Sequence, residues 1–168
     1  MGYELILFDT SLIQKQAVDE IVKYNDITVN YGLVLTEKQA IALTETRSHT
    51  LTETGRIEFG GGIIGKIITS FCDSPYISMH NYEETLHELI EMFYCYKNET
   101  LDLISDDELI KYMKKSFNGV CQGSLDLLSG RVLYNLARNL RYGYEPFGYD
   151  DMNDDVYCGE EDDEDGEY

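Results

Sequence analysis

Residues 55–76 read GRIEFGGGIIGKIITSFCDSPY and form the centre of the chain. Four of the fourteen glycines fall within six positions of it, at Gly60, Gly61, Gly62 and Gly65. After them, isoleucines and Phe71 recur at helical spacing, so we expect a buried helix that ends before Pro75. Glycines at its start allow a tight backbone turn and close packing against neighbouring helices. We expect the more polar helices on both sides to pack around this one.

The same glycines raise the question of a phosphate site. An extended segment, a glycine turn and a helix start can hold an anion through backbone N–H groups. Gly60 and Gly65-Lys66 match most of a P-loop, but Ile67 stands where that motif needs Ser or Thr for magnesium. The sequence also predicts no series of alternating strands and helices. We therefore interpret the glycines as structural and predict no cofactor. The candidate residues for a phosphate or small-molecule site are Gly60, Gly61, Gly62, Gly65 and Lys66.

Capping motifs divide the remaining chain into helices. Three capping boxes pair Thr36 with Gln39, Asn81 with Glu84 and Ser105 with Glu108, and Asp9-Thr10-Ser11 and Ser124 offer further caps. The predicted helices end by Gly32 and near Glu53, Cys72, Lys97, Phe117 and Gly143, with an interruption or tolerated glycine at Ser129-Gly130. About six helices predict a mostly α fold, a single helical domain over residues 1–143. Strand candidates at 4–8, 33–35 and 56–59 allow at most a small minor sheet.

Charge separates the end of the chain from the rest. The formal net charge is −19, and residues 150–168 hold eleven of the 32 acidic residues and no Lys or Arg. We predict that residues 144–168 form a disordered acidic tail that also contains aromatic residues. The remaining 21 acidic residues still outnumber the 13 basic ones. This balance disfavours nucleic acid and anionic membranes as partners.

Targeting signals and metal-binding spacings are not recognisable in the sequence. No apolar run approaches the ~18–20 residues of a membrane span, and the N-terminus lacks the basic region of a signal peptide. The four cysteines are widely separated, which argues against a zinc site or a redox dithiol. We expect a cytoplasmic protein.

Several segments resemble a bacterial family that is catalogued as a domain of unknown function. They are Tyr31-Gly-Leu-Val-Leu-Thr-Glu37, Phe59-Gly-Gly-Gly62, Phe71-Cys-Asp-Ser-Pro-Tyr76, the segment 98–107 and Cys121-Gln-Gly-Ser124. The resemblance covers about residues 10–142 and leaves out the acidic tail. It implies a bacterial, cytoplasmic protein and assigns no role to any residue.

A row of histidines and glutamates follows one predicted helix. His80, Glu84 and His87 lie at i, i+4 and i+7, and Glu84-x-x-His87 is a fragment of a di-iron bundle motif. At ~100° per residue, this row points roughly 100–160° away from the apolar stripe around Leu86. It therefore faces solvent or a partner, and a second Glu-x-x-His is absent from the sequence. We predict no metal and keep the three residues as candidate ligands.

The last predicted helix carries arginine and tyrosine on one face. That face consists of Arg131, Tyr134, Arg138, Arg141 and Tyr142, opposite Leu133, Leu136 and Leu140. Arginine with exposed tyrosine is typical of binding surfaces, although any surface helix needs a polar side.

Together these patterns favour an accessory or adaptor protein over an enzyme. No catalytic motif is recognisable, so we expect a non-catalytic protein that acts through protein–protein interaction, with another protein as its partner. The alternative is a ligand-binding protein or enzyme with a site at the Gly60–Lys66 loop, since sites assembled from distant residues leave no local signature.

Overall fold

The computed structural model describes the backbone of residues 2–58 and 62–143, with side chains from Leu12 onward. Its helices are α1 (Gly2–Lys23), α2 (Asn25–Thr28), η1 (Val29–Tyr31), α3 (Glu37–Thr54), α4 (Gly62–Phe71), α5 (Tyr82–Glu99), α6 (Asp106–Asn118), α7 (Leu125–Leu127), the π-helical turn η2 (Leu128–Leu133) and α8 (Tyr134–Arg141). Since α7, η2 and α8 are continuous, these elements form six main helical regions. The mostly α fold is confirmed, and the predicted tail, 144–168, lies outside the described residues.

The expected minor sheet is absent from the described ranges. Residues 4–8 lie inside α1, which begins at Gly2 and not at the cap proposed near Ser11. Residues 33–35 and 56–58 are non-helical but form no strand, and residue 59 is outside the described ranges. A short apolar run such as 5–8 fits either a helix or a strand, so periodicity alone does not separate them. Gly32 ends the η1 turn with a left-handed φ of 78°.

Two of the three predicted capping boxes are confirmed. The Thr36 and Ser105 side chains each accept a hydrogen bond from the backbone N–H three residues on. In return, the Gln39 and Glu108 side chains accept from the backbone N–H of Thr36 and Ser105. Asn81 precedes α5 as expected, but its side chain does not cap the helix. Its amide instead accepts from the Ser78 N–H and donates to the Tyr76 carbonyl. The Asn81 side chain is therefore engaged by the preceding turn and does not bond the N–H groups at the start of α5.

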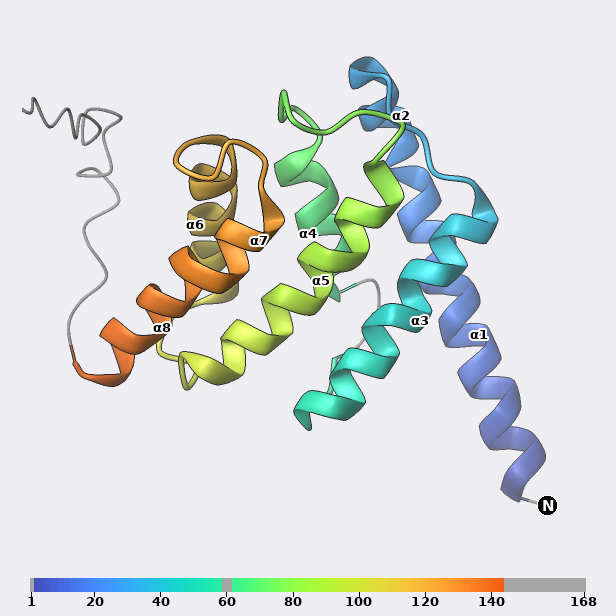
Figure 1. Cartoon of the computed structure of the whole chain (residues 1–168). Helices are drawn as coiled ribbons and strands as arrows, with labels where there is room; N and C mark the ends of the chain where they lie inside the picture. The colour runs from blue at the N-terminus through green and yellow to red at the C-terminus, as the bar shows by residue number, and fades with distance from the viewer. Residues whose placement is uncertain (1, 59–61, 144–168) are drawn as a thin grey trace, which may run out of the picture.

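Helices α3 and α5 run side by side in the same direction, and α4 lies on the other side of α5, between α5 and α6 (Figure 1). Three cross-helix bonds fix this register. Gln39 donates to Glu83 near the two starts, Thr46 bonds His87 further along, and Asn98 donates to the Thr54 carbonyl near the two ends. Helices α6 and α8 lie on the other side of α5 from α3 and α1 (Figure 1).

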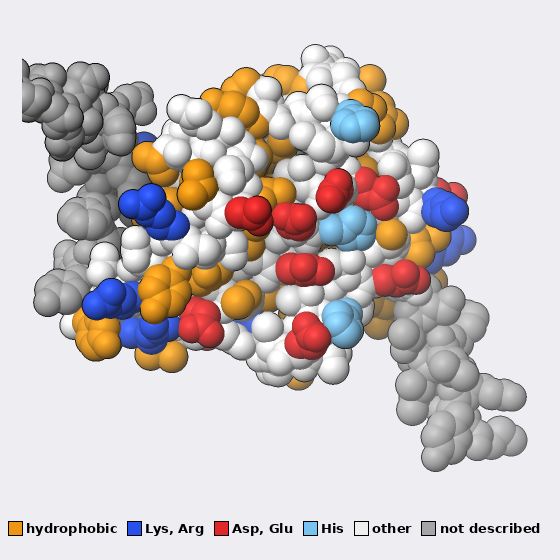
Figure 2. Space-filling view, in the orientation of Figure 1, with side chains coloured by type: hydrophobic (Ala, Val, Ile, Leu, Met, Phe, Trp, Pro, Cys, Tyr) orange, Lys and Arg blue, Asp and Glu red, His pale blue; other side chains and the backbone are white. Residues whose placement is uncertain are grey.

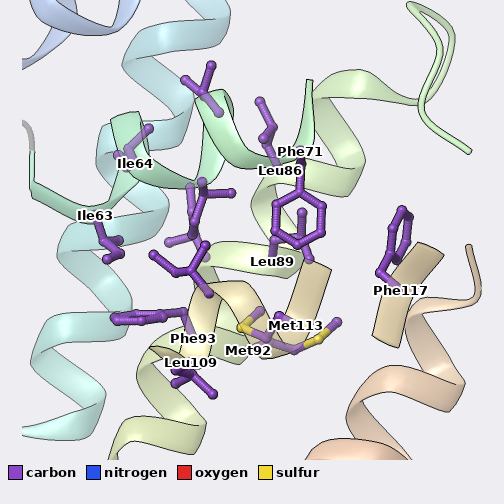
Figure 3. Close-up of a cluster of buried hydrophobic side chains, with 14 of the residues drawn as sticks. Ile63, Ile64, Phe71, Leu86, Leu89, Met92, Phe93, Leu109, Met113 and Phe117 are labelled. Carbon is purple, nitrogen blue, oxygen red and sulfur yellow. The ribbon is translucent and has the colours of Figure 1, made fainter. Parts of the chain in front are cut away.

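The core is one apolar cluster around α4 and α5 (Figure 3). Ile64 and Ile67 of α4 and Leu86 and Leu89 of α5 are fully buried. Phe71 meets Phe117 of α6 edge-to-face, with ring centroids 5.6 Å apart. The central apolar helix is therefore buried as predicted. Its close packing also needs Gly65, where a Cβ would lie 2.5 Å from the Tyr24 hydroxyl.

The predicted irregularity at Ser129-Gly130 is a π-helical turn within η2. There the Tyr96 hydroxyl donates to the Ser129 carbonyl at 2.5 Å, which ties the turn to α5. Across residues 2–58 and 62–143, no helix is both long and apolar enough to cross a membrane.

Candidate functional site

Gly62 is the first residue of α4, and an internal carboxylate occupies the helix start. Gly62 has a left-handed φ of 55°, and the Ile63 N–H donates to Glu58 Oε1 at 2.7 Å. A Cβ at position 62 would lie 1.5 Å from that same oxygen, and both this contact and the left-handed φ favour glycine there. Gly60 and Gly61 lie outside the described residues. The anion at the helix start is therefore supplied by the chain itself.

Glu58 belongs to a polar cluster that also contains Arg47 of α3, Tyr94 of α5 and the Ile63 N–H; we call it the Glu58 cluster. The Tyr94 hydroxyl donates to Glu58 Oε2 at 2.5 Å. Arg47 Nη1 lies 3.7 Å from Glu58 Oε1, beyond hydrogen-bonding distance. Burial, and then the bond to Glu58, raise the pKa of Tyr94, so this phenol stays protonated as a donor.

Arg47 is unusual within the Glu58 cluster because its donors are buried and unpaired. The residue is only 7% exposed, and its Nε and Nη1 atoms form no hydrogen bond with the residues that the structure describes. Buried polar groups nearly always have such partners, and an unpaired buried donor costs free energy. Chemically, the donors around Glu58, namely Arg47, the Tyr94 hydroxyl and the Ile63 N–H, can hold an oxyanion.

Lys66 does not join the Glu58 cluster. Its ammonium lies 2.8 Å from Asp107 on α6, and this hydrogen bond raises the pKa of Lys66. It lines a depression of about 410 Å³ between α4 and α6, together with Thr69, Ser70, Asp107, Ile110, Lys111 and Lys114. Lys114 in turn lies 3.0 Å from Asp73. Because acidic side chains already lie beside these two lysines, the depression is a poor cradle for an anion.

The three candidate metal ligands do not converge. His80 and Glu84 are exposed, whereas His87 lies between α3 and α5. Its Nδ1 is 2.7 Å from the Thr46 hydroxyl and its Nε2 is 3.3 Å from Glu83. The part of the chain that the structure describes contains no group of three His, Cys, Asp or Glu side chains that could hold a metal ion. His87 thus connects α5 to α3, whereas the sequence predicted that it faces solvent or a partner.

The five residues predicted on the last helix do share one exposed surface, which we call the α8 face. Arg131, Tyr134, Arg138, Arg141 and Tyr142 are all exposed, while Leu133, Leu136 and Leu140 are buried. Arg141 donates to the Glu99 carboxylate at 2.9 Å. For Arg131 and Arg138, no ion pair or hydrogen bond joins them to any described residue.

Figure 2 shows how charge is arranged on this side of the molecule. Acidic side chains and histidines gather over α3 and α5, and basic and hydrophobic side chains lie together over α8. Glu88, on the acidic part, has its pKa raised by burial and by the nearby Glu84, Asp126 and Glu91 carboxylates. The α8 face is therefore a basic, aromatic strip beside an acidic ridge, suited to contact a surface of opposite charge.

Sequence reasoning missed Arg47, Glu58 and Tyr94. They lie on three separate segments and meet only in the folded chain, so no local motif marks them. One signal was present: an acidic residue, Glu58, lies two positions before Gly60, the first of the three consecutive glycines.

The fold and these sites define an α-helical protein in which Glu58 caps the start of α4 and α8 carries a basic, aromatic face. The chain belongs to the family of unknown function DUF6323, whose model matches residues 20–146. The predicted membership of a family without an assigned function is therefore confirmed. No curated protein and no solved structure matches the chain.

Proposed function

We propose that this protein is a non-catalytic accessory or adaptor protein that binds another protein through the α8 face. One observation carries the proposal: Tyr134 and Tyr142 are 52% and 70% exposed beside Arg131 and Arg138, which have no ion pair with a described residue. Elsewhere in the described chain, basic side chains such as Arg56, Lys66 and Lys114 pair with acidic ones.

The composition of the α8 face supports a protein partner. Tyrosine and arginine are the residues that most often supply binding energy at interfaces, because they bury a large area and also offer polar groups. Positions 131, 134, 138 and 142 are spaced by three or four residues, so they follow one side of a helix. A partner that complements this strip presents carboxylates around a small apolar patch.

The proposed setting is the bacterial cytoplasm. Cys72, Cys95 and Cys121 are free thiols, which suits a reducing compartment. The family resemblance seen in the sequence supports a bacterial source.

Photo-crosslinking in cells tests the proposed function. A photoreactive amino acid replaces Tyr134 or Tyr142 in turn, and Tyr31, which is 53% exposed near the opposite end of the molecule, serves as the control position. We expect one common adduct from positions 134 and 142 and none from position 31. The double substitution R131E/R138E should remove that adduct. An adduct that survives the charge reversal, or that forms equally from position 31, would refute the α8 face as the binding surface.

A further inference from the structure

We propose that the start of α4 is a binding site for a phosphate group, and that the Glu58 carboxylate occupies this site until a ligand replaces it. The site consists of Arg47, Tyr94 and the Ile63 N–H. This inference is independent of the α8 face. It also differs from a P-loop, because the cation is Arg47 from α3 and not Lys66.

The first argument is that Glu58 leaves the buried donors of Arg47 without a hydrogen bond. The Ile63 N–H and the Tyr94 hydroxyl each bond one oxygen of Glu58. Within the described ranges, the buried Arg47 Nε and Nη1 form no hydrogen bond, and Nη1 lies 3.7 Å from Glu58 Oε1. In its present position, Glu58 therefore accepts hydrogen bonds from two of the donors and forms only a longer ion pair with Arg47.

A phosphate group matches this arrangement better than a carboxylate does. It offers three or four oxygens in a tetrahedral arrangement, and arginine binds phosphate through two parallel N–H donors. Backbone N–H groups and the dipole at a helix start also favour a doubly charged anion. The space is kept open by Gly62, where a Cβ would lie 2.8 Å from Arg47 Nη1.

The position of Glu58 allows its side chain to rotate away from the helix start into solvent. Its side chain is 23% exposed, and the preceding residue, Ile57, is 84% exposed in a non-helical segment. Rotation of the Glu58 side chain toward solvent would free the Ile63 N–H, the Tyr94 hydroxyl and the space beside Arg47. The carboxylate thus acts as a competitor that any ligand must displace.

Titration of the full-length protein with inorganic phosphate tests this proposal, with sodium chloride at equal ionic strength as reference. The readouts are the amide NMR signal of Ile63 and the melting temperature. We expect saturable binding to the natural protein. Glu58→Ala should bind phosphate at least about tenfold more tightly, because the competing charge is gone and one charge-assisted bond is worth about that factor.

Three further variants separate the site from its surroundings. Arg47→Gln should abolish the phosphate response. Tyr94→Phe keeps the aromatic ring and should weaken the response, so it tests the site even if Arg47→Gln does not fold. Lys66→Gln is the control and should bind phosphate as the natural protein does.

Three outcomes would overturn the proposal. The first is equal behaviour in phosphate and chloride for both the natural protein and Glu58→Ala. The second is loss of binding in Lys66→Gln, which would move the site to the depression between α4 and α6. The third is a Glu58→Ala protein that binds acetate as tightly as phosphate, because the cluster would then be only a cap for a carboxylate.

Discussion

The Lys97 ammonium donates a hydrogen bond of 2.6 Å to the carbonyl of Ile104, seven residues along the chain. The Lys97 side chain is only 6% exposed, and its charge also lies 3.0 Å from Asp106. Between these residues the chain turns through Leu101 and Asp102, both with a left-handed φ of 56°. Lys97 therefore holds together the strained turn that connects α5 to α6.

Replacing Lys97 should destabilise the fold markedly. For Lys97→Met we expect a loss of about 2–3 kcal/mol in the free energy of unfolding, because a charge-assisted bond to a carbonyl is lost and that carbonyl is left unpaired. Urea denaturation followed by circular dichroism measures this loss. Lys38→Met, the same change at an exposed position of α3, should stay within about 0.5 kcal/mol. Equal effects at the two positions would contradict the role of Lys97.

The two glycines Gly62 and Gly130 should respond in opposite directions to alanine. Gly62→Ala meets both a left-handed φ of 55° and the Glu58 carboxylate, so we expect a loss of at least about 1–3 kcal/mol. At Gly130 an added Cβ meets nothing within 4 Å, and alanine should leave stability unchanged or raise it by up to about 1 kcal/mol. Melting temperatures of the two variants check the difference. A Gly62→Ala variant as stable as the natural protein would show that neither the left-handed φ nor the Glu58 carboxylate constrains this position.

Acid should weaken the contact between Arg56 and Asp102. The hydrogen bond from Arg56 lowers the pKa of Asp102 below its usual value. A carboxyl with a lowered folded pKa stabilises the protein above its unfolded pKa of about 3.9, and this contribution is lost as the pH falls through the folded value.

The comparison of the natural protein with Asp102→Asn isolates this contribution. Because Asp102 is 54% exposed, we expect a difference in unfolding free energy of about 1 kcal/mol or less near pH 6. The difference should shrink as the pH falls below about 4. Urea titrations at several pH values measure this difference. A difference that grows in acid would contradict a stabilising contact between Arg56 and ionised Asp102.

Sequence patterns predicted the structural elements that depend on residues close together in the sequence. Thr36 and Ser105 cap helices through residues three positions away, so their capping boxes could be identified directly. The isoleucine periodicity of α4 likewise marks a buried helix, whatever packs against it. Asn81 fits the same capping pattern, yet its amide binds Ser78 and Tyr76. A local motif cannot show which of two nearby partners an asparagine selects.

The Glu58 cluster depends on contacts between distant segments. Arg47 and Tyr94 are separated by 47 positions in the sequence and come together only because α3 and α5 run side by side. From the sequence, the glycines are interpreted as structural, with an anion site only as the alternative, and no local pattern indicates that Glu58 binds the Ile63 N–H. Lys66, one residue after Gly65, faces α6 because the helical rotation turns it away from the glycine turn.

Removing residues 150–168 should leave folding intact. Their composition, with eleven acidic residues and no Lys or Arg, cannot build a core of its own. We expect the melting temperature of the shortened protein to stay within about 2 °C of the natural one, which corresponds to less than about 1 kcal/mol. A large decrease in the melting temperature would show that this segment stabilises the helical domain.

Charge reversal on the α8 face should separate binding from folding. Because Arg131 and Arg138 have no ion pair with a described residue, R131E/R138E should change the free energy of unfolding by less than about 0.5 kcal/mol. Arg141→Glu should have a larger effect, because it places a carboxylate beside Glu99 where an ion pair of 2.9 Å stands now. Urea denaturation of both variants measures these changes, and the crosslinking yield from position 134 measures binding. A double variant that loses the adduct while keeping its stability supports the α8 face as a contact surface. If stability fell together with the adduct, Arg131 and Arg138 would instead serve the fold.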